Sequence, residues 1–92
     1  MSCGSSCVCI GCGGVGLNVI QTSRLSGARN VIAVDIDDKK LSAAKAFGAT
    51  HLINGRSVGK KLARQIHKLT NGGADYAFEA VGKSVSYNQG TI

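Results

Sequence analysis

Three glycines near the start of the chain are spaced as a phosphate-binding loop requires. Gly11, Gly13 and Gly16 follow the pattern G-x-G-x-x-G, directly after the apolar run SCVCI. The first glycine of such a loop permits a tight turn off a strand, the second lets the backbone approach a pyrophosphate, and the third allows close packing of helix on strand. The helix that follows offers free N–H groups and a partial positive charge to phosphates. The spacing therefore predicts dinucleotide binding, provided that a strand precedes the loop and a helix follows it.

An acidic residue stands where the ribose of such a nucleotide would lie. Asp35 follows the apolar run NVIAV, about twenty residues after the third glycine. A carboxylate there accepts hydrogen bonds from the ribose hydroxyls and repels a 2′-phosphate, which favours NAD over NADP. One alternative is that Asp35 caps the following helix and the glycines form an ordinary turn. Another is a methyltransferase loop, although such a loop usually has an acid directly before its first glycine, where this chain has Ile10.

Clustered cysteines suggest a second kind of chemistry. The chain has four: Cys3, Cys7, Cys9 and Cys12. Such a cluster could hold zinc or an iron–sulfur centre, but Cys7 and Cys9 fall on one side of an extended strand, and Cys12 lies inside the glycine loop. We expect them to pack as small apolar side chains, without a metal site or a disulfide framework, as suits a reducing cytosol. His51 and His67 have no partner at metal-ligand spacing, and we predict no catalytic residue.

The segments that must position these residues alternate between strands and helices. Apolar and β-branched runs predict strands over 6–10, 30–36, 50–53 and 75–81, and helical spacing and capping signals predict helices over 13–26, 37–47 and 57–71. This order is typical of an α/β fold, a partial Rossmann domain with a doubly wound parallel sheet of about four strands and three helices. Residues 83–92 are polar and too few for another helix and strand, so we expect the fourth strand to be an open edge.

Length and composition limit the remaining possibilities. The 92 residues have room for one small domain, and a hydrophobic content of 43% argues against disorder throughout. No apolar run reaches the roughly 20 residues of a membrane helix, and no secretory signal is recognisable. The formal net charge is +6, with its densest cluster at Lys60, Lys61, Arg64 and Lys68. The opposite side of that helix is apolar, so we interpret the cations as a solvated face and expect no nucleic-acid or membrane partner; a nucleic-acid patch is the alternative, but no aromatic residues are interleaved.

The amino-acid sequences of three segments resemble those of a known family. The runs VCIGCGGVGLNVIQ, GARNVIAVDIDDKKLSAAKAFGATHLIN and LTNGGADYAFEAVG look like the cofactor-binding half of the zinc-type, medium-chain alcohol dehydrogenases. They are most similar to the branch that includes the class III, glutathione-dependent formaldehyde dehydrogenases. The resemblance covers roughly residues 4–83. It implies an oxidoreductase that transfers a hydride between an alcohol and NAD.

The resemblance also implies which residues contact NAD. They are Gly11, Gly13, Gly14, Val15 and Gly16 at the pyrophosphate, Asp35 and Lys40 at the ribose, Ile36 and Val81 beside the adenine, and Gly82 where the cofactor runs close to the backbone.

Other parts of the family pattern are missing from the 92 residues. The family's zinc ligands and proton relay precede the glycine loop, and two further strands with the nicotinamide contacts follow the fourth. We therefore expect residues 1–92 to be a partial NAD-binding domain without the catalytic zinc domain, inactive alone. The alternatives are a non-catalytic dinucleotide-binding module, an interaction module that pairs its open sheet edge with another chain or its own copy, or a remnant with little stable structure.

Overall fold

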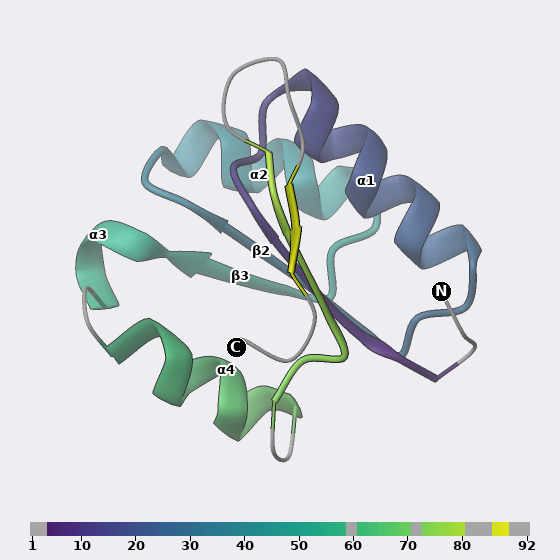
Figure 1. The fold of residues 1–92 in the computed structure, drawn as a ribbon. Coiled ribbons are helices and arrows are strands. Elements are labelled where there is room, and N and C mark those ends of the chain that lie inside the picture. Colours follow the sequence, from purple (N-terminus) through teal and green to yellow (C-terminus); the bar gives the residue numbers. More distant parts are fainter. Residues whose placement is uncertain (1–3, 59–60, 71–72, 81–85, 89–92) are drawn as a thin grey trace.

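A computed structural model describes residues 4–58, 61–70, 73–80 and 86–88 of the chain (Figure 1). Within these residues five strands form one sheet, in the order β3-β2-β1-β4-β5. The strands are β1 (Ser6–Ile10), β2 (Asn30–Asp35), β3 (His51–Asn54), β4 (Tyr76–Glu79) and β5 (Ser86–Asn88). The first four are parallel, and β1 lies between β2 and β4. The α/β, doubly wound fold predicted from the sequence is confirmed.

Helices cover both faces of this sheet. They are α1 (Gly14–Leu25), α2 (Asp38–Ala46), α3 (Gly55–Val58) and α4 (Leu62–Thr70). Figure 1 shows α1 and α2 on one side of the strands and α4 on the other. None of the helices in the described ranges combines the length and the apolar character needed to cross a membrane.

The strands bury side chains on both faces, because successive residues of a strand point in opposite directions. Val31 and Ala33 of β2 pack in one core with Ile20 of α1. Ile32, between them in sequence, packs in a second core with Ile66 of α4. This two-sided burial explains why the strands read as continuous apolar runs rather than as alternating patterns.

The third expected helix divides into two. A single turn, α3, follows β3 directly, and α4 begins at Leu62. Asn54 stands directly before α3, and its Oδ1 accepts a hydrogen bond of 2.9 Å from the backbone N–H of Arg56, as a helix N-cap does. The last residue of the predicted helix, at position 71, lies outside the described residues. The amphipathic pattern holds in α4, where Ile66 is buried.

The expectation that the fourth strand is an open edge is wrong. Strand β5 pairs antiparallel with β4, with Tyr87 opposite Phe78, so β4 lies between β1 and β5. The expectation assumed that only a further helix and a parallel strand could cover β4. An antiparallel partner needs only a short connection, so a strand close in sequence can cover β4 without an intervening helix.

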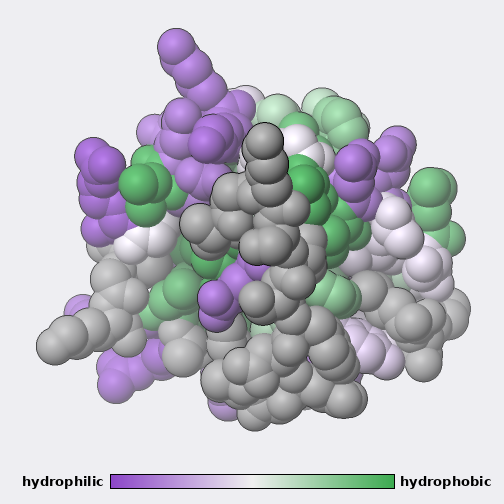
Figure 2. All heavy atoms as spheres, turned by 45° about the horizontal axis from the view of Figure 1, so that its top comes forward, coloured by the Kyte–Doolittle hydropathy of each residue, from purple (hydrophilic) through white to green (hydrophobic). Residues whose placement is uncertain are grey.

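Some large apolar side chains remain on the surface. Leu25 and Ile36 are 82% and 59% exposed, and Phe47 and Leu52 are also exposed. Figure 2 shows hydrophobic residues interspersed with hydrophilic ones on the face that it draws. Isolated apolar groups of this kind are normal on protein surfaces, but Ile36 stands beside a cleft.

Candidate functional site

A cleft of about 390 Å³ opens where the carboxyl ends of β1 and β2 meet. Its lining consists of Gly11, Cys12, Gly13, Asp35, Ile36, Lys40 and Ala80. Strand β1 has β2 on one side and β4 on the other, so the strand order changes direction here. Doubly wound sheets bind their ligands at such a switch point, outside the carboxyl ends of the strands.

Two of the loop's glycines are required by the fold itself. Gly11 has φ +97°, a left-handed conformation that strains other residues. Its N–H donates to the Val34 carbonyl at 2.8 Å, which ties the turn to β2. A Cβ at Gly16 would overlap the Gly11 carbonyl and would contact Ala80. The first and third glycines therefore allow α1 to pack against its own loop.

The middle of the loop is open by contrast. A Cβ on Gly13 or Gly14 would meet nothing within 4 Å. Gly13 is the N-cap of α1 without a side-chain cap, and the first turn carries no acidic residue. The first intrahelical bond runs from the Leu17 N–H to the Gly13 carbonyl, at 2.8 Å. The N–H groups before Leu17 lack an intrahelical acceptor, so they and the helix dipole favour an anion here.

The carboxylate of Asp35 faces this loop. Its Oδ2 accepts a hydrogen bond of 2.8 Å from the Cys12 N–H, and its Oδ1 accepts one of 3.0 Å from the Asp37 N–H. Burial alone would raise the pKa of Asp35, but the backbone N–H groups of Cys12, Asp37 and Ile36, together with the charge of Lys40, lower it below its usual value. Asp35 is therefore ionised at neutral pH, with acceptor capacity left over.

The helix-capping alternative for Asp35 does not describe this geometry. The N-cap of α2 is Asp37, whose Oδ1 accepts a hydrogen bond of 2.9 Å from the Lys39 N–H. Asp35 instead connects the end of β2 to the glycine loop. Sequence reasoning missed the Cys12 N–H, which makes this connection, and Ala80, which follows β4 and lines the cleft. The signal for Cys12 was its place between the first two glycines of the motif.

The structure brings together most of the residues predicted to contact a nucleotide. Gly11, Gly13, Asp35, Ile36 and Lys40 line the cleft. Gly14, Val15 and Gly16 form the first turn of α1, whose N–H groups lie at the same end. Predicted contacts Val81 and Gly82 lie outside the described residues.

The cysteines near the loop are buried, as expected. Cys7, Cys9 and Cys12 are free thiols, and each is no more than 1% exposed. Burial raises the pKa of Cys9 to about 12 and that of Cys12 to about 11, helped at Cys12 by the negative charge of Asp35. Cys3 lies outside the described residues. In the part of the chain that the structure describes, no group of three or more His, Cys, Asp or Glu side chains is arranged to hold a metal ion.

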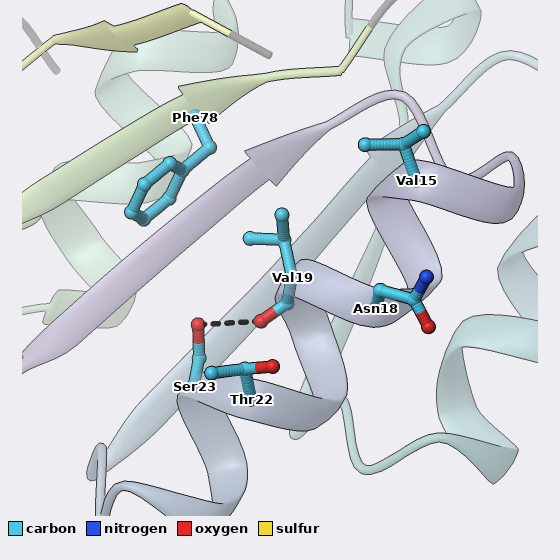
Figure 3. A pocket seen from close by; sticks show the side chains of 6 residues that line it. All are labelled: Val15, Asn18, Val19, Thr22, Ser23 and Phe78. Atoms are coloured by element: carbon cyan, nitrogen blue, oxygen red, sulfur yellow. Dashed lines mark hydrogen bonds between the residues drawn. The ribbon is translucent and has the colours of Figure 1, made fainter. Parts of the chain in front are cut away.

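A second hollow, of about 260 Å³, lies on the flank of α1. Figure 3 shows Phe78 of β4 on one side and five residues of α1 on the other: Val15, Asn18, Val19, Thr22 and Ser23. The Ser23 hydroxyl donates to the Val19 carbonyl at 2.7 Å. The side chain of Val15 lines this flank cavity, so Val15 could contact a nucleotide in the cleft only through its backbone.

Known proteins share both the fold and the sequence. Among solved structures, an alcohol dehydrogenase zinc-binding domain protein from Burkholderia ambifaria is 41% identical, with a TM-score of 0.82, over 88% of this chain and 21% of that one. A zinc-dependent alcohol dehydrogenase 2 from Streptococcus pneumonia is 43% identical, with a TM-score of 0.81, over 88% of this chain and 24% of that one. Benzyl alcohol dehydrogenase from Acinetobacter calcoaceticus is 39% identical, with a TM-score of 0.79, over 89% and 22%.

The chain thus spans less than a quarter of the length of each of these enzymes. The resemblance to zinc-type alcohol dehydrogenases that the sequence suggested is confirmed by this likeness. A family model described as zinc-binding dehydrogenase matches residues 14–91. Because that match extends over most of the sequence, the chain belongs to the zinc-binding dehydrogenase family.

Proposed function

We propose that the chain is the NAD-binding segment of a zinc-type alcohol dehydrogenase. The observation that carries this proposal is the 2.8 Å hydrogen bond from the Cys12 N–H to Asp35 Oδ2, which places the glycine loop and the acid at one cleft. One nucleotide can then reach a phosphate site at the start of α1 and a ribose site at the end of β2.

The residues present fit a dinucleotide. The space above Gly13 and Gly14 is open beside the N–H groups of α1, which suits a pyrophosphate. Ionised Asp35 suits the ribose hydroxyls, and exposed Ile36 offers an apolar surface to an adenine ring. The cleft volume of about 390 Å³ lies within the range of small-molecule sites.

Bound NAD would supply the hydride acceptor for oxidation of an alcohol. The chain's own residues hold and orient the nucleotide. Asp35 and Lys40 meet the ribose, and the charge of Asp35 disfavours the 2′-phosphate of NADP. We assign zinc and the alcohol to the intact protein, and we propose that these 92 residues alone do not oxidise alcohol.

Calorimetric titration with NAD and NADP tests the proposal. We expect the chain to bind NAD more tightly than NADP, and Asp35→Asn to weaken NAD binding about tenfold, because a charge-assisted hydrogen bond is lost. Asp75→Asn is the matched control, since Asp75 also accepts a backbone hydrogen bond of 2.8 Å, from the Ser6 N–H, but at the amino ends of β1 and β4, away from the cleft. Absence of NAD binding, or equal affinity for NADP, would contradict the proposal.

Two finer assignments belong to the same proposal. The sequences of the three segments support assignment to the class III, glutathione-dependent formaldehyde dehydrogenase branch. The free thiols support a location of the protein in a reducing cytosol. An intact protein of this branch should act on formaldehyde combined with glutathione in preference to ethanol. A preference for ethanol in steady-state kinetics would remove the branch assignment while leaving the NAD site in place.

A further inference from the structure

The side chain of Asn54, at the end of β3, contacts the connection between β2 and α2. Its Nδ2 donates to Asp38 Oδ1 at 2.8 Å and to the Ile36 carbonyl at 3.4 Å. Its Oδ1 accepts from the Arg56 N–H at 2.9 Å. One amide therefore joins the end of β3, the start of α3 and the segment that follows Asp35.

That segment forms one wall of the cleft. Ile36 lines the cleft with an exposed side chain. The Asp37 N–H donates one of the hydrogen bonds that hold the Asp35 carboxylate. Asn54 does not line the cleft itself. It contacts this wall through its hydrogen bonds to Ile36 and Asp38.

We propose that Asn54 is a positioning residue for the adenosine half of the nucleotide. One donor bond goes to the Ile36 backbone carbonyl and the other to the Asp38 carboxylate. Together they hold residues 36–38 in place, and through them both the orientation of Asp35 and the place of Ile36. The inference rests on the proposed function, because it takes the cleft to bind a nucleotide with its adenosine at this wall. It predicts selective damage: loss of Asn54 should weaken contacts to adenosine and leave the phosphate site at α1 intact.

The competing explanation is that Asn54 only caps α3. Serine is a good helix N-cap and carries no amide that could reach Asp38. Asn54→Ser therefore keeps an acceptor for the Arg56 N–H and removes the donor bonds. A purely capping role predicts that this variant behaves like wild type.

Calorimetry with two probes, AMP and inorganic pyrophosphate, separates the two halves of the site. For Asn54→Ser we expect the Kd of AMP to rise roughly threefold to tenfold, because one to two hydrogen bonds that hold the adenosine wall are lost. The Kd of pyrophosphate should be unchanged. The matched control is Asn30→Ser, which removes the bond of 3.1 Å from Asn30 Nδ2 to Ser6 Oγ at the other end of β2. Wild-type affinity for AMP in Asn54→Ser, or an equal loss for both probes, would overturn the inference.

Hydrogen exchange in the ligand-free chain gives a readout that does not depend on binding. In Asn54→Ser the amide of Asp37 should exchange roughly threefold to tenfold faster, while Val31 in the middle of the sheet is unchanged. If wild type binds neither NAD nor AMP, the proposed function fails and takes this inference with it. If wild type binds AMP but the variant changes neither affinity nor exchange, only the role of Asn54 fails.

Discussion

Two hollows touch the same helix, and their chemistry differs. The cleft at the N-terminus of α1 is built from backbone N–H groups, glycines and the ionised Asp35. The flank cavity between α1 and β4 is almost wholly apolar, although Asn18, Thr22 and Ser23 stand at its walls. Val15 serves both, with its backbone in the first turn and its side chain in the flank. The difference teaches that the N-terminus of a helix presents backbone N–H groups to a hollow, whereas its flank presents only side chains.

The largest expected effect concerns the third glycine of the loop. Gly16→Ala should destabilise the chain by about 3 kcal/mol or more, because its Cβ would overlap the Gly11 carbonyl, which is backbone and cannot move cheaply. Urea unfolding measures this loss. Gly13→Ala is the control, since Gly13 has an ordinary φ of −76° and open space around it. It should cost no more than about 1 kcal/mol, because alanine is a poorer N-cap than glycine, and should lose nucleotide affinity. Equal stability of both variants would contradict this account of the loop.

The next largest effect is the stability that Asp35 contributes. Asp35→Asn should cost about 1.5–3 kcal/mol at pH 7, because hydrogen bonds from the Cys12 and Asp37 N–H groups to a charged acceptor are weakened. The folded pKa of Asp35 is lowered, so this stabilisation is complete above the ordinary value of 3.8 and is lost as pH falls through the folded value. Unfolding curves should therefore converge for wild type and variant in acid. A difference that does not shrink as the pH falls below 3.8 would oppose this explanation.

A smaller effect is expected on the flank of α1. Val19 is half-buried and packs against the core between α1 and the sheet. Val19→Ala should cost about 1 kcal/mol through lost packing and leave the AMP affinity unchanged, because the flank cavity lies apart from the cleft. Thr22→Ala, at an exposed position of the same wall, should change neither quantity. A change in AMP affinity for Val19→Ala would mean that the two hollows are coupled through the helix.

The two hollows were not equally predictable from the sequence. The spacing of Gly11, Gly13 and Gly16 encodes local backbone conformations, so it indicated the cleft and its partner Asp35. The flank cavity depends on how β4 approaches α1, and no spacing within either segment encodes that approach. The same reason explains why β4 was wrongly predicted to be an open edge of the sheet. The pairing of β5 with β4 is a contact between two segments, and the three polar residues of β5 carry no strand pattern of their own. The role of Asn54 was hidden because its partners lie sixteen and eighteen residues away.

The smallest effect is expected for the thiols behind the two hollows. Cys12 lines the cleft, and Cys7 Sγ lies 3.3 Å from the Ser23 Oγ of the flank cavity. Burial raises the pKa of both, to about 11 for Cys12, so roughly one Cys12 thiol in a thousand is a thiolate at pH 8. Iodoacetamide at that pH should leave both unmodified in the folded chain and modify both in urea, as mapped by peptide mass spectrometry.

The raised pKa values of these buried thiols determine how the stability of the folded chain changes with pH. Thiols of the unfolded chain ionise near their ordinary value of 9.0, before the buried ones do. The stability contributed by the buried, protonated thiols is therefore complete below pH 9 and is lost as pH rises through the folded values. Modification of both cysteines should begin together in that range, because it follows unfolding of the same core. Selective modification of Cys12 at pH 8 would show instead that the cleft opens while the flank stays closed, which the hydrogen bond between Cys12 and Asp35 should prevent.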